Sequence, residues 1–169
     1  MKSSVFVVAL TACLIVPHAA AAPLVEVRFV SPDRYSDASP YSRTIDKPAR
    51  DAVLAELRQH LQSLGAKFLG ADDRLTIDVL DVDLAGEIEL SRDGQERRAL
   101  DERTLPRIQL RYTLDRDGTT VTREERVTEL GYLFDPNRCR FDGALCREKV
   151  MLAAWFERTF AGASAPVSR

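Results

Sequence analysis

The segment centred on Asp117-Gly118 constrains the fold more than any other part of this chain. Apolar and polar residues alternate before this dipeptide, and an Asp-Gly pair between alternating segments favours a two-residue type I′ turn. The sequence therefore predicts a β-hairpin with one buried and one solvated face. Pairing the chain outward from the turn places Leu114 opposite Val121 and Ile108 opposite Val127 on one face, with Arg111 opposite Glu124 and Gln109 opposite Arg126 on the other.

Two segments carry apolar residues at helical spacing. The first begins at Asp46, a favourable N-cap residue, has Pro48 in its first turn, and is expected to end at Gly65. His60 lies on the flank of its apolar stripe and is expected to be a solvated surface residue. The second helix is expected from about Leu145 to Phe160, with an aromatic-rich face that is typical of a core. The stripe of the first helix consists of Val53, Leu54, Leu57, Leu61 and Leu64.

The remaining regular segments are typical of strands. Residues 25–29 alternate between apolar and charged side chains, as in a half-buried strand. The apolar pattern of residues 75–84 changes phase near Val79-Leu80, which indicates a β-bulge or a strand buried on both faces. Asp93-Gly94 predicts a turn, and residues 96–103 are expected to form a solvated loop or edge. This order predicts an α+β fold, with a mainly antiparallel sheet of four or five strands and two helices on one face.

The N-terminus has the three parts of a secretory signal peptide. A positively charged start at Lys2 precedes an apolar run that is too short to span a bilayer, and small residues follow it. Cleavage after Ala21 leaves one domain over residues 22–161 and a frayed tail over residues 162–169. We therefore expect a periplasmic or secreted protein with no transmembrane segment in the mature chain. Cys13 ends a lipoprotein-like box, so a lipid anchor at Cys13 is the alternative.

The expected export and the net charge limit the kinds of partner that the mature chain can have. Cys139 and Cys146 are expected to form a disulfide in an oxidising compartment, because their spacing matches neither a redox pair nor a zinc site. The whole chain has 24 Lys and Arg against 26 Asp and Glu, a net charge of −2. No basic surface is therefore expected that would attract nucleic acid. The expected partner is an envelope protein or a small ligand.

The long segment over residues 31–45 is the first candidate binding site. Loops of about this length inside a compact domain are uncommon and often functional. This one carries large and basic side chains at Arg34, Tyr35, Tyr41 and Arg43. The alternative, which we favour, is that both tyrosines simply pin the loop onto the body of the protein.

An acidic cluster around residues 78–89 is the second candidate site. An EF-hand pattern that starts at Asp81 fails, because Ala85 replaces a ligand and Arg92 stands where the bidentate glutamate must be. Asp81 and Asp83 share a face of a regular strand, so a divalent cation site on these two residues remains as a minor hypothesis. The alternative is a charged strand end that discourages pairing between sheet edges.

Motifs for catalysis and for cofactors are missing from the sequence. There is no nucleophile elbow, no zinc-protease motif, and no glycine-rich nucleotide loop, so no catalytic residue and no cofactor are predicted. A pair of carboxylates acting on an envelope polymer leaves no sequence mark. We therefore expect a non-enzymatic binding or adaptor module, with a carboxylate-dependent hydrolase as the alternative.

Five segments in order resemble one known family. They are residues 29–32 followed by Tyr35 and Asp37, residues 81–87, residues 106–112, residues 129–133, and the helical pattern over residues 148–160. The set is similar to the exported bacterial family catalogued as domain of unknown function 3016, over nearly the whole mature chain. The resemblance implies a bacterial envelope protein and supplies no activity or catalytic residues. Cys139 and Cys146 are not part of the family pattern.

Overall fold

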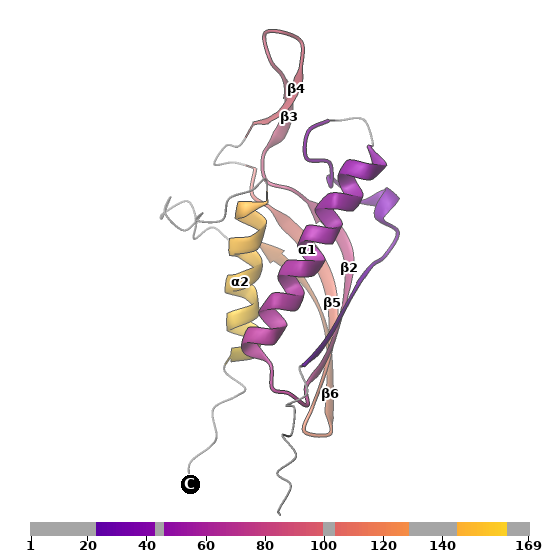
Figure 1. Ribbon diagram of the computed structural model, residues 1–169, viewed down its shortest axis with the longest axis vertical. Coiled ribbons are helices and arrows are strands. Elements are labelled where there is room, and N and C mark those ends of the chain that lie inside the picture. The colour runs from indigo at the N-terminus through magenta and orange to yellow at the C-terminus, as the bar shows by residue number, and fades with distance from the viewer. Residues whose placement is uncertain (1–22, 43–45, 100–103, 129–144, 162–169) are drawn as a thin grey trace, which may run out of the picture.

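The central element is a four-stranded mixed sheet. The computed structural model describes residues 23–42, 46–99, 104–128 and 145–161 (Figure 1). The sheet has the strand order β1 (Leu24–Phe29), β2 (Arg74–Asp83), β5 (Arg107–Arg116) and β6 (Thr119–Thr128). The β1–β2 pair is parallel because helix α1 (Lys47–Phe68) connects the two strands, and the other pairs are antiparallel.

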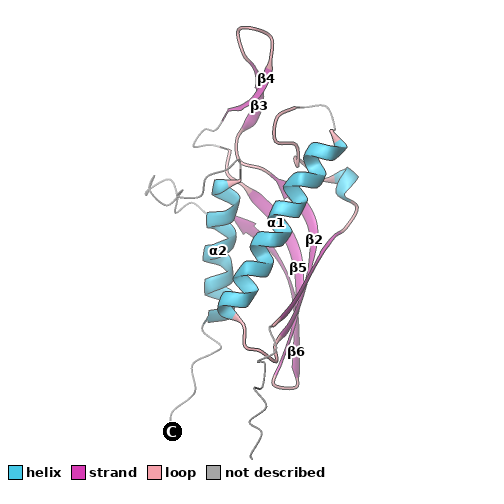
Figure 2. Cartoon of the chain, viewed as in Figure 1, coloured by secondary structure: helices cyan, strands magenta, loops and turns pink. Residues whose placement is uncertain are grey.

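Both long helices cover the same face of this sheet. Helix α1 and helix α2 (Cys146–Phe160) lie side by side in front of the strands in Figure 2. The predicted α+β class, with its mainly antiparallel sheet and two helices on one face, is confirmed. A separate two-stranded hairpin, β3 (Glu87–Leu90) and β4 (Glu96–Ala99), projects from the end of the sheet. A short 3₁₀ helix, η1 (Pro32–Arg34), follows β1.

The β5–β6 hairpin has the predicted register. Leu114 lies opposite Val121, and Ile108 lies opposite Val127. The turn residues Asp117 and Gly118 have φ angles of 51° and 74°, as a type I′ turn requires. On the other face, Arg111 lies opposite Glu124 and its Nη2 donates to Glu124 Oε2 at 2.8 Å, whereas Gln109 lies opposite Arg126.

The phase change in β2 is a β-bulge, as predicted. Its register against β5 shifts between Val79 and Asp81, which lets both Val79 and Val82 face the helices. Asp81 and Asp83 then lie opposite Gln109 and Arg107, on the face away from the helices. The bulge therefore determines where the two acidic residues lie at the end of the strand.

Helix α1 begins as predicted but ends later. The Asp46 side chain accepts a hydrogen bond from the Ala49 amide at 3.4 Å. The expectation that Gly65 ends the helix is wrong, because the helix continues to Phe68. Gly65 instead allows a close approach of β1, since a Cβ atom there would lie 2.2 Å from Val25 Cγ2. All five predicted stripe residues are buried: Val53, Leu54, Leu57, Leu61 and Leu64.

His60 differs from its expected solvated state. Its imidazole is half-buried between the helices, and its Nε2 lies 3.0 Å from the Lys149 carbonyl oxygen. Burial lowers the pKa of His60 below its ordinary value. The residue therefore contributes to the contact between α1 and α2.

The aromatic face of α2 forms one wall of the core, as predicted. Trp155, Phe156 and Phe160 are almost completely buried, and their rings pack edge-on or tilted against one another. Tyr112 of β5 joins this cluster. The Trp155 indole N–H donates to Glu125 Oε2 at 3.0 Å, so its polar group is satisfied at the sheet edge.

Several predictions concern residues outside the described part of the chain. They are the signal peptide over residues 1–21 with Cys13, the tail over residues 162–169, and the disulfide, because Cys139 is not described. Within the described ranges, neither helix has the length and apolar character needed to cross a bilayer.

Candidate functional site

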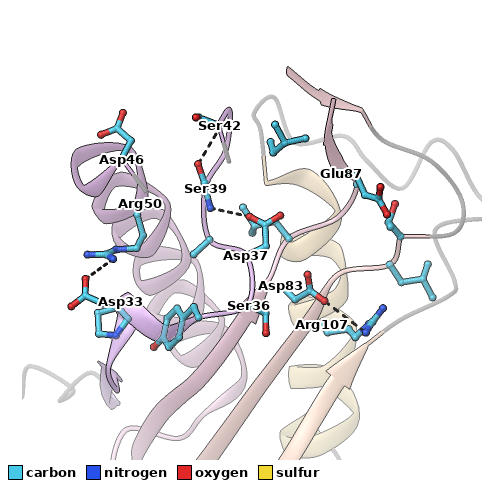
Figure 3. A pocket seen from close by; sticks show the side chains of 18 residues that line it. Asp33, Ser36, Asp37, Ser39, Ser42, Asp46, Arg50, Asp83, Glu87 and Arg107 are labelled. Atoms are coloured by element: carbon cyan, nitrogen blue, oxygen red, sulfur yellow. Dashed lines mark hydrogen bonds and ion pairs between the residues drawn. The ribbon is translucent and has the colours of Figure 1, made fainter. Parts of the chain in front are cut away.

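A cavity of about 530 Å³ opens at the end of the sheet where β2 stops and β5 begins (Figure 3). The loop after β1 and the first turns of α1 form one side. The end of β2, the base of β3 and the segment before β5 form the other. Its polar lining includes five carboxylates and two arginines, contributed by residues that are far apart in the sequence: Asp33, Asp37, Asp46, Arg50, Asp83, Glu87 and Arg107.

The loop after β1 is held against β2 by side-chain and backbone hydrogen bonds. The Tyr35 hydroxyl donates to the Val79 carbonyl at 2.8 Å, and burial raises the pKa of Tyr35 to about 12. Both oxygens of Asp81 accept from Ser36, one from its amide and one from its hydroxyl, each at 2.7 Å. Asp37 then pairs with β2 as a parallel bridge to Asp83. These bonds form the cavity wall from a segment that contains little regular structure.

Arg98 of β4 fixes this loop to the base of the projecting hairpin. Its Nη2 donates to both carboxylate oxygens of Asp37, at 2.9 and 2.7 Å, and also to the Ser39 carbonyl. Its Nη1 donates to the Ala85 and Gly86 carbonyls, at 3.1 and 2.9 Å. The Arg98 side chain is only 9% exposed. One guanidinium therefore joins the loop, the end of β2 and β4.

Glu148 in the first turn of α2 lies behind this network. It is 2% exposed, and its Oε1 accepts from the Ala85 amide at 2.7 Å. Burial raises the pKa of Glu148, although the Ala85 amide and the neighbouring Arg98 favour its charged form. The amide and the carbonyl of Ala85 are thus bound by two side chains from different elements.

Arg50, from a buried position on α1, forms a second ion pair at the cavity with an exposed carboxylate. Its Nη1 lies 2.6 Å from Asp33 Oδ1, and its side chain is 6% exposed. Asp33 itself is exposed on η1. This pair ties the 3₁₀ helix to the first turns of α1, as the dashed line in Figure 3 shows.

Asp83 is a partly buried carboxyl in the cavity. Burial raises its pKa, and the charges of Asp37 and Asp81 raise it further. Arg107 opposes this effect, with its Nη1 3.7 Å from Asp83 Oδ2. A carboxyl group with a raised pKa beside other carboxylates is a typical arrangement at a binding or catalytic site.

A comparison with protein families identifies this chain. The model of the family described as "Protein of unknown function (DUF3016)" matches residues 23–158. The chain belongs to this family. The matched segment contains every residue that lines the cavity of this DUF3016 protein. No curated protein and no solved structure matches the chain.

The predicted binding loop contributes only in part to the cavity of the DUF3016 protein. Tyr35 lines the cavity and pins the loop to β2, as the favoured interpretation expected of both tyrosines, whereas the exposed Tyr41 does not fit that interpretation. Arg34 is exposed on η1 and Tyr41 is 63% exposed, and neither lines the cavity. Arg43 lies outside the described residues.

The two predicted acidic residues have different environments. Asp83 lines the cavity, whereas Asp81 does not and instead accepts the two hydrogen bonds from Ser36 that hold the loop against β2. Across the described ranges, no group of three or more His, Cys, Asp or Glu side chains is arranged to hold a metal ion.

Sequence reasoning missed most of the polar residues that build the cavity. The segment with Arg98 was expected to be solvated, and this expectation is wrong for Arg98 because its side chain is buried against Asp37. Asp37 appeared only as part of the family resemblance. Arg50 lies three and four positions before Val53 and Leu54, in line with the apolar stripe of α1, and this charged residue on the stripe was the one available signal. The pairs that these residues form are between distant segments, so no local pattern marks them.

Proposed function

We propose that this DUF3016 protein is an exported, non-enzymatic binding protein of the bacterial envelope that holds a small polar ligand in the cavity. The observation that carries the proposal is a cavity of about 530 Å³ whose walls are fixed by hydrogen bonds within the protein. Sites for small ligands commonly have volumes of about 300 to 1,000 Å³ and are largely pre-formed. Walls held in advance reduce the ordering that a ligand must bring about.

The charge of the cavity favours a ligand that carries a basic group. Arg50 compensates Asp33, and Arg107 lies close to Asp83. Arg98 compensates Asp37 from outside the cavity. Asp46 and Glu87 add two exposed carboxylates at the rim. An ammonium or guanidinium group would therefore find negative charge at the cavity mouth and hydrogen-bond acceptors deeper inside.

The test is a ligand screen on the chain recovered from cells that express the full sequence. Thermal stability is measured with amines, amino acids, short peptides, oligosaccharides and organic acids, and calorimetry gives the affinity of each compound that raises Tm. We expect compounds with basic groups to bind. A screen in which no class raises Tm would contradict the proposed function.

Two residues of β3 offer a matched pair of variants for this test. Glu87 lines the cavity, whereas Glu89 is exposed on the same strand and does not. We expect Glu87→Gln to weaken binding by about tenfold, the effect of one charge contact. Glu89→Gln, which removes the same charge nearby, is expected to leave the affinity unchanged. Equal losses in the two variants would place the ligand elsewhere.

A carboxylate-dependent hydrolase is the second candidate, favoured by the raised pKa of Asp83 beside Asp37. A raised pKa is a property of carboxyl groups that act as general acids. Under this hypothesis, envelope polymers are turned over and Asp83→Asn removes turnover while the fold is retained. The binding hypothesis expects no turnover with either chain.

Export is tested on the same expressed chain. Cell fractionation with mass spectrometry of the N-terminal peptide distinguishes cleavage after Ala21 from a lipid on Cys13. The same digest shows whether Cys139 and Cys146 are linked. Crosslinking in intact cells tests the adaptor form of the proposal, which expects one dominant envelope partner.

A further inference from the structure

The outer edge of β6 is a long strand edge that no described strand covers. β6 is the last strand of the sheet, and its ten residues pair with β5 without a register shift. It contains no proline and no bulge, two common means of blocking a sheet edge, and its charged residues 123–126 are of both signs, two Arg and two Glu. The opposite edge is the shorter β1, where Glu26 and Arg28 pair with each other along the strand. β6 is therefore the edge better suited to pairing with another strand.

The hairpin turn determines which backbone groups of β6 point outward. Thr119 lies opposite Arg116 and closes the two-residue turn, so its backbone groups bond to β5. In an antiparallel ladder, alternate residues direct their N–H and C=O groups to the other side. The groups available at the free edge therefore belong to the next residue and every second one after it: Thr120, Thr122, Glu124, Arg126 and Thr128.

The sequence of β6 is complementary to itself in one antiparallel register of this edge. With Glu124 opposite Glu124 of a second copy, two kinds of favourable pair arise on the helix-covered side, one of opposite charges and one of valines. On that side, registers moved by two residues in either direction replace these pairs by Val opposite Glu or Val opposite Arg and place Arg123 or Glu125 opposite itself, although one of them pairs Glu124 with Arg126 on the other face. The pairs in the favoured register are Arg123 with Glu125, Val121 with Val127, Thr122 with Arg126, and Thr120 with Thr128.

The like charges at the centre of this register are already compensated within each chain. Glu124 Oε2 accepts from Arg111 at 2.8 Å, and Glu124 Oε1 accepts from Gln109 at 3.1 Å. Arg123, by contrast, forms no ion pair with any described residue although it is exposed. A second copy would supply Glu125 opposite it. Glu125 accepts from Trp155, and a carboxylate has capacity for further donors.

A groove along β6 provides an independent observation. It has a volume of about 370 Å³ and lies between the β5–β6 hairpin and the last turn of α2. Val121 borders it and is 39% exposed, one of the few large apolar side chains on the described surface. A second β6 strand would place Val127 opposite Val121 at this groove.

We propose that two copies of the protein pair antiparallel through β6, with Glu124 on the two-fold axis, so that their sheets become one continuous sheet. This symmetric contact uses the same surface on both copies, as two-fold dimers do. It joins the edges of the sheets that carry the two grooves. The cavity, at the end of the sheet near β3, is formed within each copy.

Sedimentation analysis of the purified protein over a range of micromolar concentrations tests the proposal. We expect a reversible dimer. Thr122→Lys places a like charge opposite Arg126 of the partner copy, whereas Thr122→Glu places an opposite charge there. Since each exchange acts twice in a symmetric dimer, the dimer Kd is expected to differ by about tenfold between the two variants, with Thr122→Glu tighter. A monomer at all concentrations, or equal Kd values, would overturn the proposal.

Cysteine crosslinking tests the register itself. Residues at position 124 of the two copies would face each other with their Cα atoms about 5.5 Å apart, within the range for a disulfide. We expect Glu124→Cys to give a covalent dimer under mild oxidation. Arg126→Cys serves as the matched control, because position 126 would lie opposite Thr122 of the second copy and not opposite position 126. Equal crosslinking of the two variants, or none at position 124, would refute this register whatever the oligomeric state.

Discussion

Replacement of Arg98 by methionine is the most direct test of how the cavity is built. Methionine keeps much of the side-chain volume but removes every hydrogen bond that the guanidinium donates. Arg98 is the one described side chain that bonds to both the loop around Asp37 and the end of β2 at Ala85 and Gly86. Its loss should therefore destabilise the fold much more than the loss of a surface arginine.

The structure gives the size of this effect. Removal of one partner from a buried ion pair costs about 3 to 5 kcal/mol. Asp37 is 28% exposed, so water can compensate part of its charge and the lower end of this range applies. Water can also reach some of the carbonyl groups that lose a donor, through the cavity. We expect a loss of about 3 kcal/mol in the free energy of unfolding, which lowers the urea midpoint by about 1.5 M at an m-value of about 2 kcal/mol/M.

Fluorescence of the single tryptophan follows unfolding in urea, because Trp155 is 2% exposed in the core. Arg28→Met is the matched control, since Arg28 and Glu26 form a 2.7 Å ion pair with side chains 56% and 51% exposed, away from β6. Exposed pairs contribute less than about 1 kcal/mol, so the control midpoint should move by less than about 0.5 M. Equal shifts in Arg98→Met and Arg28→Met would show that the Arg98 network does not hold the fold together.

Three further predictions concern residues outside the cavity lining. Gly65→Ala should destabilise the protein by about 1 to 3 kcal/mol despite the higher helix propensity of alanine, and the added change Val25→Ala should restore most of the loss in urea melts. Glu148→Gln should raise Tm at neutral pH and lose this advantage toward pH 4, because the raised pKa of Glu148 makes its ionised form the unfavourable one in the folded state. As the pH falls below 6.5, the ordinary pKa of histidine, the His60→Gln variant should lose less stability than the unchanged protein. The pKa of His60 is lowered in the folded state, so protonation favours the unfolded chain. For the two titrating residues, pH profiles of stability that run parallel to that of the unchanged protein would refute the reasoning.

Local patterns predicted the regular elements because each pattern has its cause close by in the chain. The turn at Asp117-Gly118 gave the β5–β6 register, and the phase change at Val79-Leu80 gave the bulge in β2. The end of α1 was mispredicted for the opposite reason. Gly65 is a local helix-stop signal, but its role is to accommodate Val25 from another strand.

The cavity was largely beyond sequence reasoning for the same physical reason. Asp83 and Tyr35 were found, because an acidic strand end and a long aromatic loop are visible in the sequence. Arg98 and Asp37 are 61 positions apart, and nothing in a charged segment distinguishes a buried arginine from the solvated ones beside it. Only the topology shows that the hairpin after β2 returns to the loop after β1.

Buried charge does not by itself distinguish the cavity from the rest of the molecule. Arg116 and Asp73 form an equally buried pair at the opposite end of the sheet, where Asp73 also accepts from the Gly70 amide. That pair closes a turn and borders neither of the two hollows described above. The Arg98–Asp37 pair also supports structure, but it supports one wall of a space large enough for a ligand. Stability and ligand binding should therefore respond differently. Arg98→Met should lower both the free energy of unfolding and the affinity for the ligand, whereas Glu87→Gln at the rim should lower only the affinity.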